Sequence, residues 1–304
     1  MAQMAVNLGG IAMKNPVTVA SGTFGYGQEY AELFDISRLG AVTVKGIRAC
    51  PWPGNPLPRH TEVPGGMINA IGLQGPGVEA FIRDDMPFLA ERNVPTIVNI
   101  WGTSVEEYAQ VAARLEGVPG VCGLELNVSC PNVKEGGASF GTRVETFTEV
   151  VRAVRAATTL PILPKLAPNV PDVRPFVLAA QEAGANAVSL INTLPGMAVD
   201  LETRRPVLAN RVGGLSGAGI HPIALKHVWE AAQVADIPIL AMGGLFSARD
   251  ALDFILVGAT AVAVGTATFI DPLAPLHVLE GMERWLDEHG IADIADFRGT
   301  LRLS

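Results

Sequence analysis

Eight short apolar runs recur along the chain, and each has the length and composition of a buried β-strand. Most of them lack the alternation of apolar and polar residues that marks a strand with one solvated face. Such runs are typical of parallel strands covered on both faces. The runs are Val17–Ala20, Ala41–Gly46, Thr96–Gly102, Gly123–Cys130, Pro161–Leu166, Ala187–Thr193, Pro238–Gly244 and Ala261–Ala267.

The segments between these runs show the apolar spacing of helices. They are Val78–Asn93, Val105–Leu115, Pro171–Ala183, Pro222–Val234, Ala248–Val257 and Pro275–Glu288. Ser104 and Glu107 are placed to form a capping box at the start of the second segment. Strands and helices that alternate over 304 residues predict an α/β fold, the (β/α)8 TIM barrel. A doubly wound open sheet is the alternative, but no glycine-rich dinucleotide or P-loop motif supports it.

The remaining segments predict additions to the barrel. Val6–Leu8 and Ile11–Met13 read as a small N-terminal hairpin that would plug the barrel bottom. Two insertions rich in Gly and Pro, Arg48–Gly77 and Leu194–Gly219, follow the second and sixth strands. Both lie on the side where barrels build their active sites. Because no low-complexity linker interrupts the chain, we expect residues 1–304 to form a single barrel domain.

Composition and charge exclude several classes of protein. Apolar residues make up 49% of the chain and charged residues 17%, which is enough for a large core. The net charge of −8 argues against a nucleic-acid partner, which would require a basic face. We see no signal peptide and no apolar run that could span a bilayer, so a cytoplasmic protein is expected. The cysteines Cys50, Cys122 and Cys130 form no Cys-x-x-Cys pair, so the sequence predicts no disulfide framework, metal site or iron–sulfur cluster.

Polar residues and glycines collect at the carboxyl ends of the predicted strands. They are Ser21-Gly22, Lys45-Gly46, Asn99, Asn127 with Cys130, Lys165, Asn192-Thr193, Gly243-Gly244 and Gly265-Thr266. Lys45 and Lys165 stand in apolar runs, where a lysine is costly unless an anion lies nearby. The plainer alternative is a lysine whose ammonium reaches solvent from the strand end. We therefore expect these residues to surround one ligand site.

The glycine pair Gly243-Gly244 follows the seventh strand, and Gly265-Thr266 follows the eighth. Loops at these positions commonly bind phosphate through backbone N–H groups, although either one alone could be a plain turn. Together with the lysines and amide side chains, they predict a flat, phosphorylated, hydrogen-bonding cofactor and a small anionic substrate.

The thiol of Cys130 ends a strand in which Leu124, Leu126 and Val128 alternate with polar residues. A free cysteine is most often a small core residue. Here Pro131 ends the strand, Asn127 lies close in sequence, and a glycine-rich loop follows. That setting favours a reactive thiol at the mouth of the barrel.

Four motifs carry a resemblance to a known enzyme family. They are Asn127-Val128-Ser129-Cys130-Pro131-Asn132, Asn69-Ala70-Ile71-Gly72-Leu73, Ile191-Asn192-Thr193 and Gly243-Gly244. From about Leu8 to about Trp285, the chain resembles the class 1 dihydroorotate dehydrogenases, which are FMN-containing barrels of pyrimidine synthesis. Ile191–Ala198 and Gly213–Gly217 resemble the 1B subclass. One departure is Gly75, where the family usually has Asn.

The resemblance implies a reaction and a set of partners. The chain would oxidise (S)-dihydroorotate to orotate in de novo pyrimidine biosynthesis, with Cys130 as the base for the C5 proton and FMN as the acceptor of the C6 hydride. In the 1B subclass a separate subunit with FAD and a 2Fe–2S cluster passes the electrons to NAD⁺. The resemblance also implies a barrel homodimer within a heterotetramer.

The resemblance also implies the residues of the site. FMN would be held by Ser21, Lys45, Gly46, Asn99, Asn127, Lys165, Ile191, Gly217, Gly243, Gly244, Gly265 and Thr266. The substrate would meet Lys45, Asn69, Ala70, Ile71, Gly72, Leu73, Asn127, Asn192 and Thr193. No residue is assigned to a metal.

Other functions remain open at this point. A tRNA dihydrouridine synthase is also an FMN barrel with a cysteine, but the acidic net charge disfavours it. A dihydrouracil-type dehydrogenase is distinguished only by the segments that resemble the 1B subclass. A barrel that merely binds a phosphorylated ligand would leave Cys130 without a role.

Overall fold

The structure, a computed structural model, describes residues 2–128 and 140–303. Its centre is a ring of eight parallel strands, as the sequence predicts. In ring order they are β3 (Val17–Val19), β4 (Val42–Ile47), β7 (Thr96–Ile100), β8 (Val121–Leu126), β9 (Ile162–Pro164), β10 (Val188–Leu190), β15 (Ile239–Met242) and β16 (Ala261–Val264).

Two four-stranded ladders, β4-β7-β8-β9 and β10-β15-β16-β3, make up this ring. At one seam Lys165 and Ser189 form a parallel bridge between the ends of β9 and β10. At the other seam the Gly40 N–H donates to the Val17 carbonyl at 2.9 Å, and the hydroxyls of Thr18 and Thr43 lie 3.3 Å apart. The (β/α)8 prediction is thereby confirmed.

Several predicted strands extend past the observed strands at their carboxyl ends, and two of them show why. The run predicted as Gly123–Cys130 leaves the sheet after Leu126, because the Val128 N–H turns back to the Leu126 carbonyl at 3.1 Å. The run predicted to end at Ala267 stops at Val264, and the 3-10 helix η4 (Thr266–Phe269) follows it. In both places polar or glycine residues leave the ladder to form the mouth of the barrel.

Helices cover the outside of the ring. They include α4 (Val105–Leu115), α6 (Val144–Ala157), α7 (Arg174–Glu182), α8 (His221–Ala232), α9 (Ala248–Leu256) and α10 (Ala274–Glu288). The predicted helix Val78–Asn93 is α2 (Val78–Ala80), the π-helical turn η2 (Phe81–Asp85) and α3 (Met86–Glu91). The sequence reading missed α6, although Phe147, Val150, Val151 and Val154 mark its buried face at helical spacing. Short helices complete the chain: α1 (Gln28–Ala31), η1 (Ile36–Arg38), η3 (Ala218–Ile220) and α11 (Ile294–Phe297).

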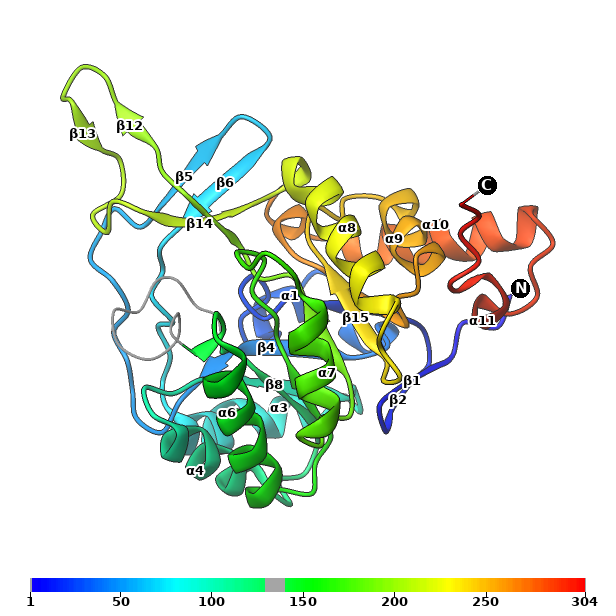
Figure 1. Cartoon of the computed structure of the whole chain (residues 1–304), viewed down its shortest axis with the longest axis horizontal. Helices are drawn as coiled ribbons and strands as arrows, with labels where there is room; N and C mark the ends of the chain where they lie inside the picture. Colours follow the sequence, from blue (N-terminus) through cyan, green and yellow to red (C-terminus); the bar gives the residue numbers. More distant parts are fainter. Residues whose placement is uncertain (1, 129–139, 304) are drawn as a thin grey trace.

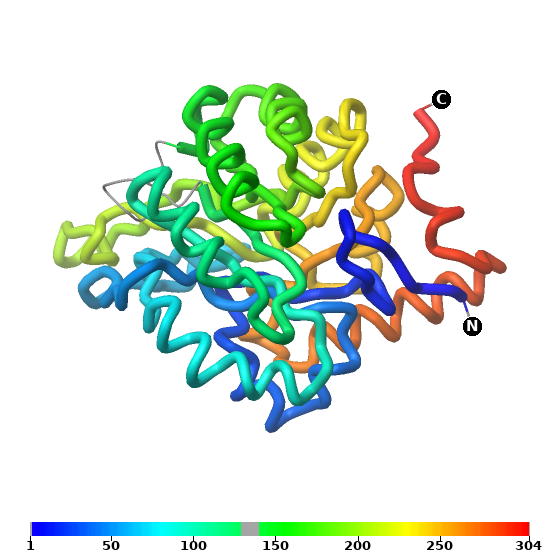
Figure 2. Tube along the Cα trace, turned by 90° about the horizontal axis from the view of Figure 1, so that it is seen from below, coloured from blue at the N-terminus to red at the C-terminus, as the bar shows by residue number. Residues whose placement is uncertain are grey.

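The N-terminal hairpin consists of β1 (Val6–Leu8) and β2 (Ile11–Met13). Leu8, Ile11 and Met13 are buried in one cluster with residues of the barrel strands, so the hairpin plugs the barrel as expected. In Figure 2 the blue N-terminal segment reaches the orange and red C-terminal region, and Gln3 forms a parallel bridge with Asp293. Within the described residues, no helix has the length and apolar character that crossing a membrane requires.

The two insertions pair with each other, which the sequence reading did not foresee. They form an antiparallel sheet in the order β11 (Leu194–Gly196), β14 (Gly213–Ser216), β6 (Gly66–Asn69) and β5 (His60–Val63). A small ribbon of β12 (Val199–Asp200) and β13 (Arg205–Pro206) extends from it (Figure 1). Glycines make the close pairing possible, because a Cβ on Gly66 would collide with the Ser216 carbonyl.

Candidate active site

A cavity of about 870 Å³ lies at the carboxyl ends of the barrel strands, beside the antiparallel sheet of the two insertions. Its volume falls within the range of about 300–1,000 Å³ that is usual for small-molecule and cofactor sites. Ends of the parallel strands and both insertions contribute to its wall, so segments far apart in the sequence meet here.

All twelve residues predicted to hold FMN line this one cavity: Ser21, Lys45, Gly46, Asn99, Asn127, Lys165, Ile191, Gly217, Gly243, Gly244, Gly265 and Thr266. Of the residues predicted to meet substrate, Lys45, Asn69, Ile71, Gly72, Leu73, Asn127, Asn192 and Thr193 line it too. Ala70 does not, because its side chain is fully buried in a small cluster with Ile68 and Leu208. Cys130 lies outside the described residues.

Several wall residues were missed by the sequence reading. His60, Glu62 and Met67 come from the β5–β6 hairpin, and Phe269 and Ile270 follow β16. Phe269 is 56% exposed and Ile270 76% exposed, so both lie at the rim of the cavity and also face solvent. No local pattern marks them, because they reach the cavity only through the pairing of the insertions and the 3-10 turn after β16.

Beneath the cavity, the inward side chains of the barrel change from apolar to polar. Residues two apart on a strand face the same side. Ile97 and Leu163 lie in the apolar cluster of the N-terminal hairpin, and two residues further on come Asn99 and Lys165. Glu125, the register partner of Asn99 on β8, is also fully buried. The alternation thus places a polar layer directly above the plugged apolar interior.

Glu125 is the residue that connects this polar layer. Its Oε2 accepts a hydrogen bond from Asn99 Nδ2 at 2.6 Å and lies 3.7 Å from Lys165 Nζ. Its Oε1 accepts from the Ser189 hydroxyl at 2.8 Å. We call Asn99, Glu125, Lys165 and Ser189 the floor network. The sequence reading did not assign Glu125 any role, although an acid inside a strand of apolar residues was a signal for it.

The asparagines of the wall are held in place by neighbouring groups. Asn192 Nδ2 donates to Asn127 Oδ1 at 3.2 Å, which joins β10 to β8 above the floor network. The Tyr108 hydroxyl donates to the Asn127 carbonyl at 2.8 Å. Asn99 Oδ1 is buried and has no hydrogen-bond partner among the described residues. An acceptor in that position suits a ligand that brings its own N–H group.

Backbone conformation shapes the glycine end of the cavity. Gly243 has a φ of 123° and Gly244 a φ of 68°, values that favour glycine. A Cβ on Gly244 would lie 2.5 Å from the backbone nitrogen of His221, the first residue of α8. The N-terminus of that helix therefore lies close behind the glycine pair. Backbone N–H groups and a helix N-terminus together suit an anionic phosphate.

Gly75, the departure from the family pattern, is part of a backbone bridge. Its N–H and carbonyl exchange hydrogen bonds of 3.0 and 2.9 Å with Trp52. A Cβ at this position would lie 3.1 Å from the Gly46 carbonyl. The bridge fixes the segment that carries Gly72 and Leu73 into the cavity wall.

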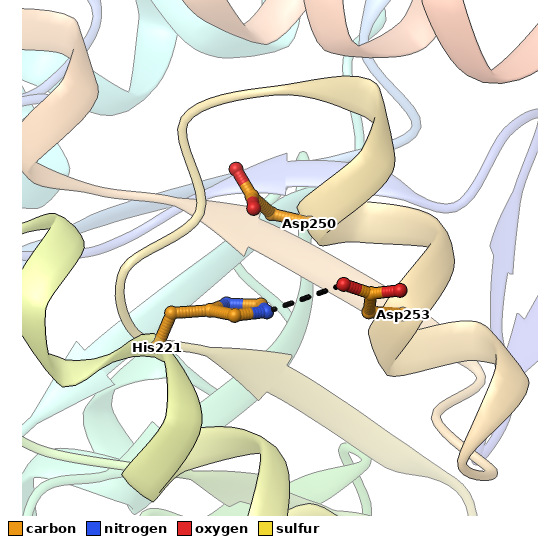
Figure 3. Close-up of side chains that lie close together, drawn as sticks. All are labelled: His221, Asp250 and Asp253. Atoms are coloured by element: carbon orange, nitrogen blue, oxygen red, sulfur yellow. Dashed lines mark ion pairs between the residues drawn. The ribbon is translucent and has the colours of Figure 1, made fainter.

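A separate side-chain cluster joins His221 to Asp250 and Asp253 of α9 (Figure 3). His221 Nε2 lies 3.6 Å from Asp253 Oδ2. Asp250 Oδ2 already accepts from the backbone N–H and the hydroxyl of Ser247 in a capping box. None of the three residues lines the cavity. The cluster therefore fixes α9 against α8, and we assign it no ligand.

The two cysteines in the described part of the chain are not candidates for the catalytic thiol. Burial raises the pKa of Cys122 to about 12, and its Sγ donates to the Thr96 carbonyl at 3.2 Å. Such a thiol is inert near neutral pH. Cys50 is exposed, and neither cysteine lines the cavity.

Comparison with known proteins shows the family of the chain. The dihydroorotate dehydrogenase family model matches residues 3–286. A protein of Pelobacter propionicus, named dihydroorotate dehydrogenase B (NAD(+)), catalytic subunit, is 55% identical over 298 residues, 98% of each chain. Proteins of the same name are 53% identical in Citrifermentans bemidjiense, over 99% of this chain and 98% of the relative, and in Desulforudis audaxviator, over 97% and 96%. The chain therefore belongs to the dihydroorotate dehydrogenase family.

Proposed function

We propose that this chain is an FMN-dependent dihydroorotate dehydrogenase, the catalytic subunit of an NAD⁺-linked enzyme of pyrimidine biosynthesis. One observation carries the proposal beyond family membership. Two lysines, the wall asparagines and the Gly243-Gly244 turn converge on a single cavity of suitable volume. We also propose that residues 1–304 form one barrel domain.

The described residues fit FMN on chemical grounds. The glycine pair beside the N-terminus of α8 would hold the phosphate. Asn99 Oδ1 would accept from a ring N–H, since it is buried and no described residue is its partner. Lys165, buried at the cavity floor, would place a cation beside the pyrimidine part of the ring. When bound, FMN supplies the hydride acceptor for the reaction.

The substrate would lie over the ring between the first insertion and the wall asparagines. Lys45 supplies a positive charge for the substrate carboxylate, and the asparagine amides offer both donors and acceptors to a pyrimidine edge. Cys130 is proposed as the base that removes the C5 proton while the C6 hydride leaves on the opposite face. It follows the buried Val128 by two residues, beyond the end of β8.

The electrons would leave through a second protein. The relatives are named as catalytic subunits of an NAD(+) enzyme, which implies a partner chain. We propose that this partner carries FAD and a 2Fe–2S cluster, and that two barrels associate within a heterotetramer. The N-terminal and insertion segments add no dinucleotide fingerprint to the barrel.

The decisive experiment is an activity assay on the purified chain with an artificial dye as the electron acceptor. Dihydroorotate should reduce the dye at a rate at least a hundredfold above that with dihydrouracil at equal concentration. Equal rates, or a preference for dihydrouracil, would contradict the proposed substrate. A protein that binds FMN but oxidises neither compound would contradict the proposed reaction.

A further inference from the structure

Among the described residues, Glu125 is the one acid and Lys165 the one lysine or arginine that are buried. Both lie in the floor network, where their charged atoms are 3.7 Å apart. A buried ion pair is weak support for stability, since an apolar pair of the same size often stabilises a protein as well. The position of this pair under the cavity indicates a functional reason for it.

The hydrogen bonds of Glu125 also decide how Asn99 is turned. A carboxylate paired with a lysine only accepts hydrogen bonds, so Asn99 must direct its Nδ2 toward Glu125 Oε2, at 2.6 Å. Its Oδ1 then faces away from Glu125, and a Cβ on the cavity-lining Gly46 would lie 2.9 Å from it. Asn99 is thereby fixed as an acceptor beside the cavity, whereas a freely rotating amide could present either end.

The charge of Glu125 acts on the same region. Lys165 lines the cavity, and Glu125 is behind it, fully buried and outside the cavity wall. A lysine alone would create a strong positive field at the cavity, because charges interact more strongly away from water. The carboxylate offsets much of that field while it leaves the ammonium in place.

We propose that Glu125 is a positioning residue that sets the charge and hydrogen-bond polarity of the cavity floor. It holds the Lys165 ammonium at the cavity and turns the Asn99 carbonyl oxygen toward a bound flavin. It also keeps the midpoint potential of that flavin lower than Lys165 alone would set it. This inference rests on the proposed function, because it concerns the same cofactor site.

The experiment measures the two-electron midpoint potential of the bound FMN in the purified protein by dye-coupled titration at pH 7. Glu125→Gln removes the charge but can still accept from Asn99 and donate to Ser189. It should shift the equilibrium toward reduced flavin at least tenfold, which is about 30 mV for a two-electron couple. Lys165→Met should shift it at least tenfold in the opposite direction.

The double variant Glu125→Gln with Lys165→Met separates a charge effect from general damage. Its potential should lie above that of Lys165→Met and below that of Glu125→Gln, because the two lost charges are opposite. This comparison tests Glu125 even if the single Glu125→Gln protein does not fold. A mere structural defect would not move the two single variants in opposite directions.

A matched control keeps the Glu125–Lys165 pair intact. Glu107→Gln removes the carboxylate of another poorly exposed ion pair, with Arg48 at 2.7 Å, and neither of its residues lines the cavity. This variant should keep the flavin equilibrium within threefold of the parent.

The outcomes separate this inference from the proposed function. A parent protein that binds no FMN would overturn both. If the parent binds FMN, the role of Glu125 alone is overturned by either of two results for Glu125→Gln. Its flavin equilibrium could stay within threefold of the parent, or it could shift in the same direction as that of Lys165→Met. A double variant with the potential of Lys165→Met would do the same.

Discussion

Replacing Arg48 with methionine should loosen the first insertion, because Arg48 anchors the point where that insertion leaves the barrel. Its guanidinium pairs with Glu107 at 2.7 Å and lies 4.9 Å from the ring centroid of Trp52 and 4.8 Å from that of Trp101. The side chains of Arg48 and Glu107 are only 14% and 11% exposed. Methionine keeps much of the apolar stem but loses the charge, the hydrogen bonds and both cation–π contacts.

The free energy of unfolding should fall by about 3 kcal/mol at pH 7. Removing one partner of a buried ion pair costs about 3–5 kcal/mol, mostly because the other charge stays buried without compensation. The lower end applies here, since the remaining exposure of Glu107 admits some water. Glu107→Gln should cost less than Arg48→Met, because it leaves the cation to its two tryptophan contacts.

The loss should also depend on pH. Burial raises the pKa of Glu107, but hydrogen bonds from Arg48 and Thr103 outweigh burial and hold it below its ordinary value. A lowered folded-state pKa stabilises the protein above the unfolded-state pKa, and this contribution disappears as the pH falls through the folded-state value. The difference between the parent and Arg48→Met should therefore be full at pH 7 and shrink below about pH 4.

Urea unfolding, followed by tryptophan fluorescence, measures these differences. The double variant Arg48→Met with Glu107→Gln closes a thermodynamic cycle, and its loss should be clearly smaller than the sum of the single losses. Arg48→Met should also affect function, because Trp52 forms the backbone bridge to Gly75, close to the cavity-lining Leu73. The KM for dihydroorotate should rise while the FMN content stays that of the parent. Single losses below 1 kcal/mol, or full additivity, would refute the anchoring role.

Three further predictions concern the proposed reaction. Heat should release about one FMN per chain, as chromatography would show, and finding FAD or no flavin in folded protein would contradict the cofactor assignment. Cys130→Ala should keep FMN but reduce it with dihydroorotate orders of magnitude more slowly than the parent. Cys130→Ser should retain some activity with an optimum at higher pH, because a hydroxyl is a weaker acid than a thiol. The chain alone should reduce dyes but hardly NAD⁺. Addition of a subunit with FAD and an iron–sulfur cluster should restore NAD⁺ reduction. Efficient NAD⁺ reduction by the chain alone would disprove the subclass assignment.

The eight barrel strands could be predicted from the sequence because their signal is local. Each is a short apolar run, because a strand that is buried on both faces favours apolar residues at every position. The residues at their carboxyl ends could be assigned to one site for the same reason, since parallel strands bring those ends to one edge. The antiparallel sheet gave no such signal. It pairs Asn69 with Gly214 across the two insertions, and no local pattern in either insertion predicts which segment it pairs with.

Glu107 shows how a local pattern fails when tertiary contacts compete. Its spacing from Ser104 predicts a capping box, and Ser104 does accept from the Glu107 N–H at 3.3 Å. The reciprocal bond is not formed, because the Glu107 carboxylate binds Arg48 and the backbone and hydroxyl of Thr103. At Ser247 and Asp250 the full capping box forms. The partner that decided the outcome lies 59 residues away in the chain.

Glu125 marks the limit of sequence reasoning for the site itself. Its alternation with Leu124 and Leu126 predicts that it faces the other side of the strand, which is correct. In an open sheet that side could have been solvent, where an acid needs no partner. Ring closure makes it the barrel interior and brings Asn99, Lys165 and Ser189 from three other strands within reach of one carboxylate. The burial of Glu125 is therefore a consequence of ring closure, and its partners are the inward-facing residues of the same layer of the barrel.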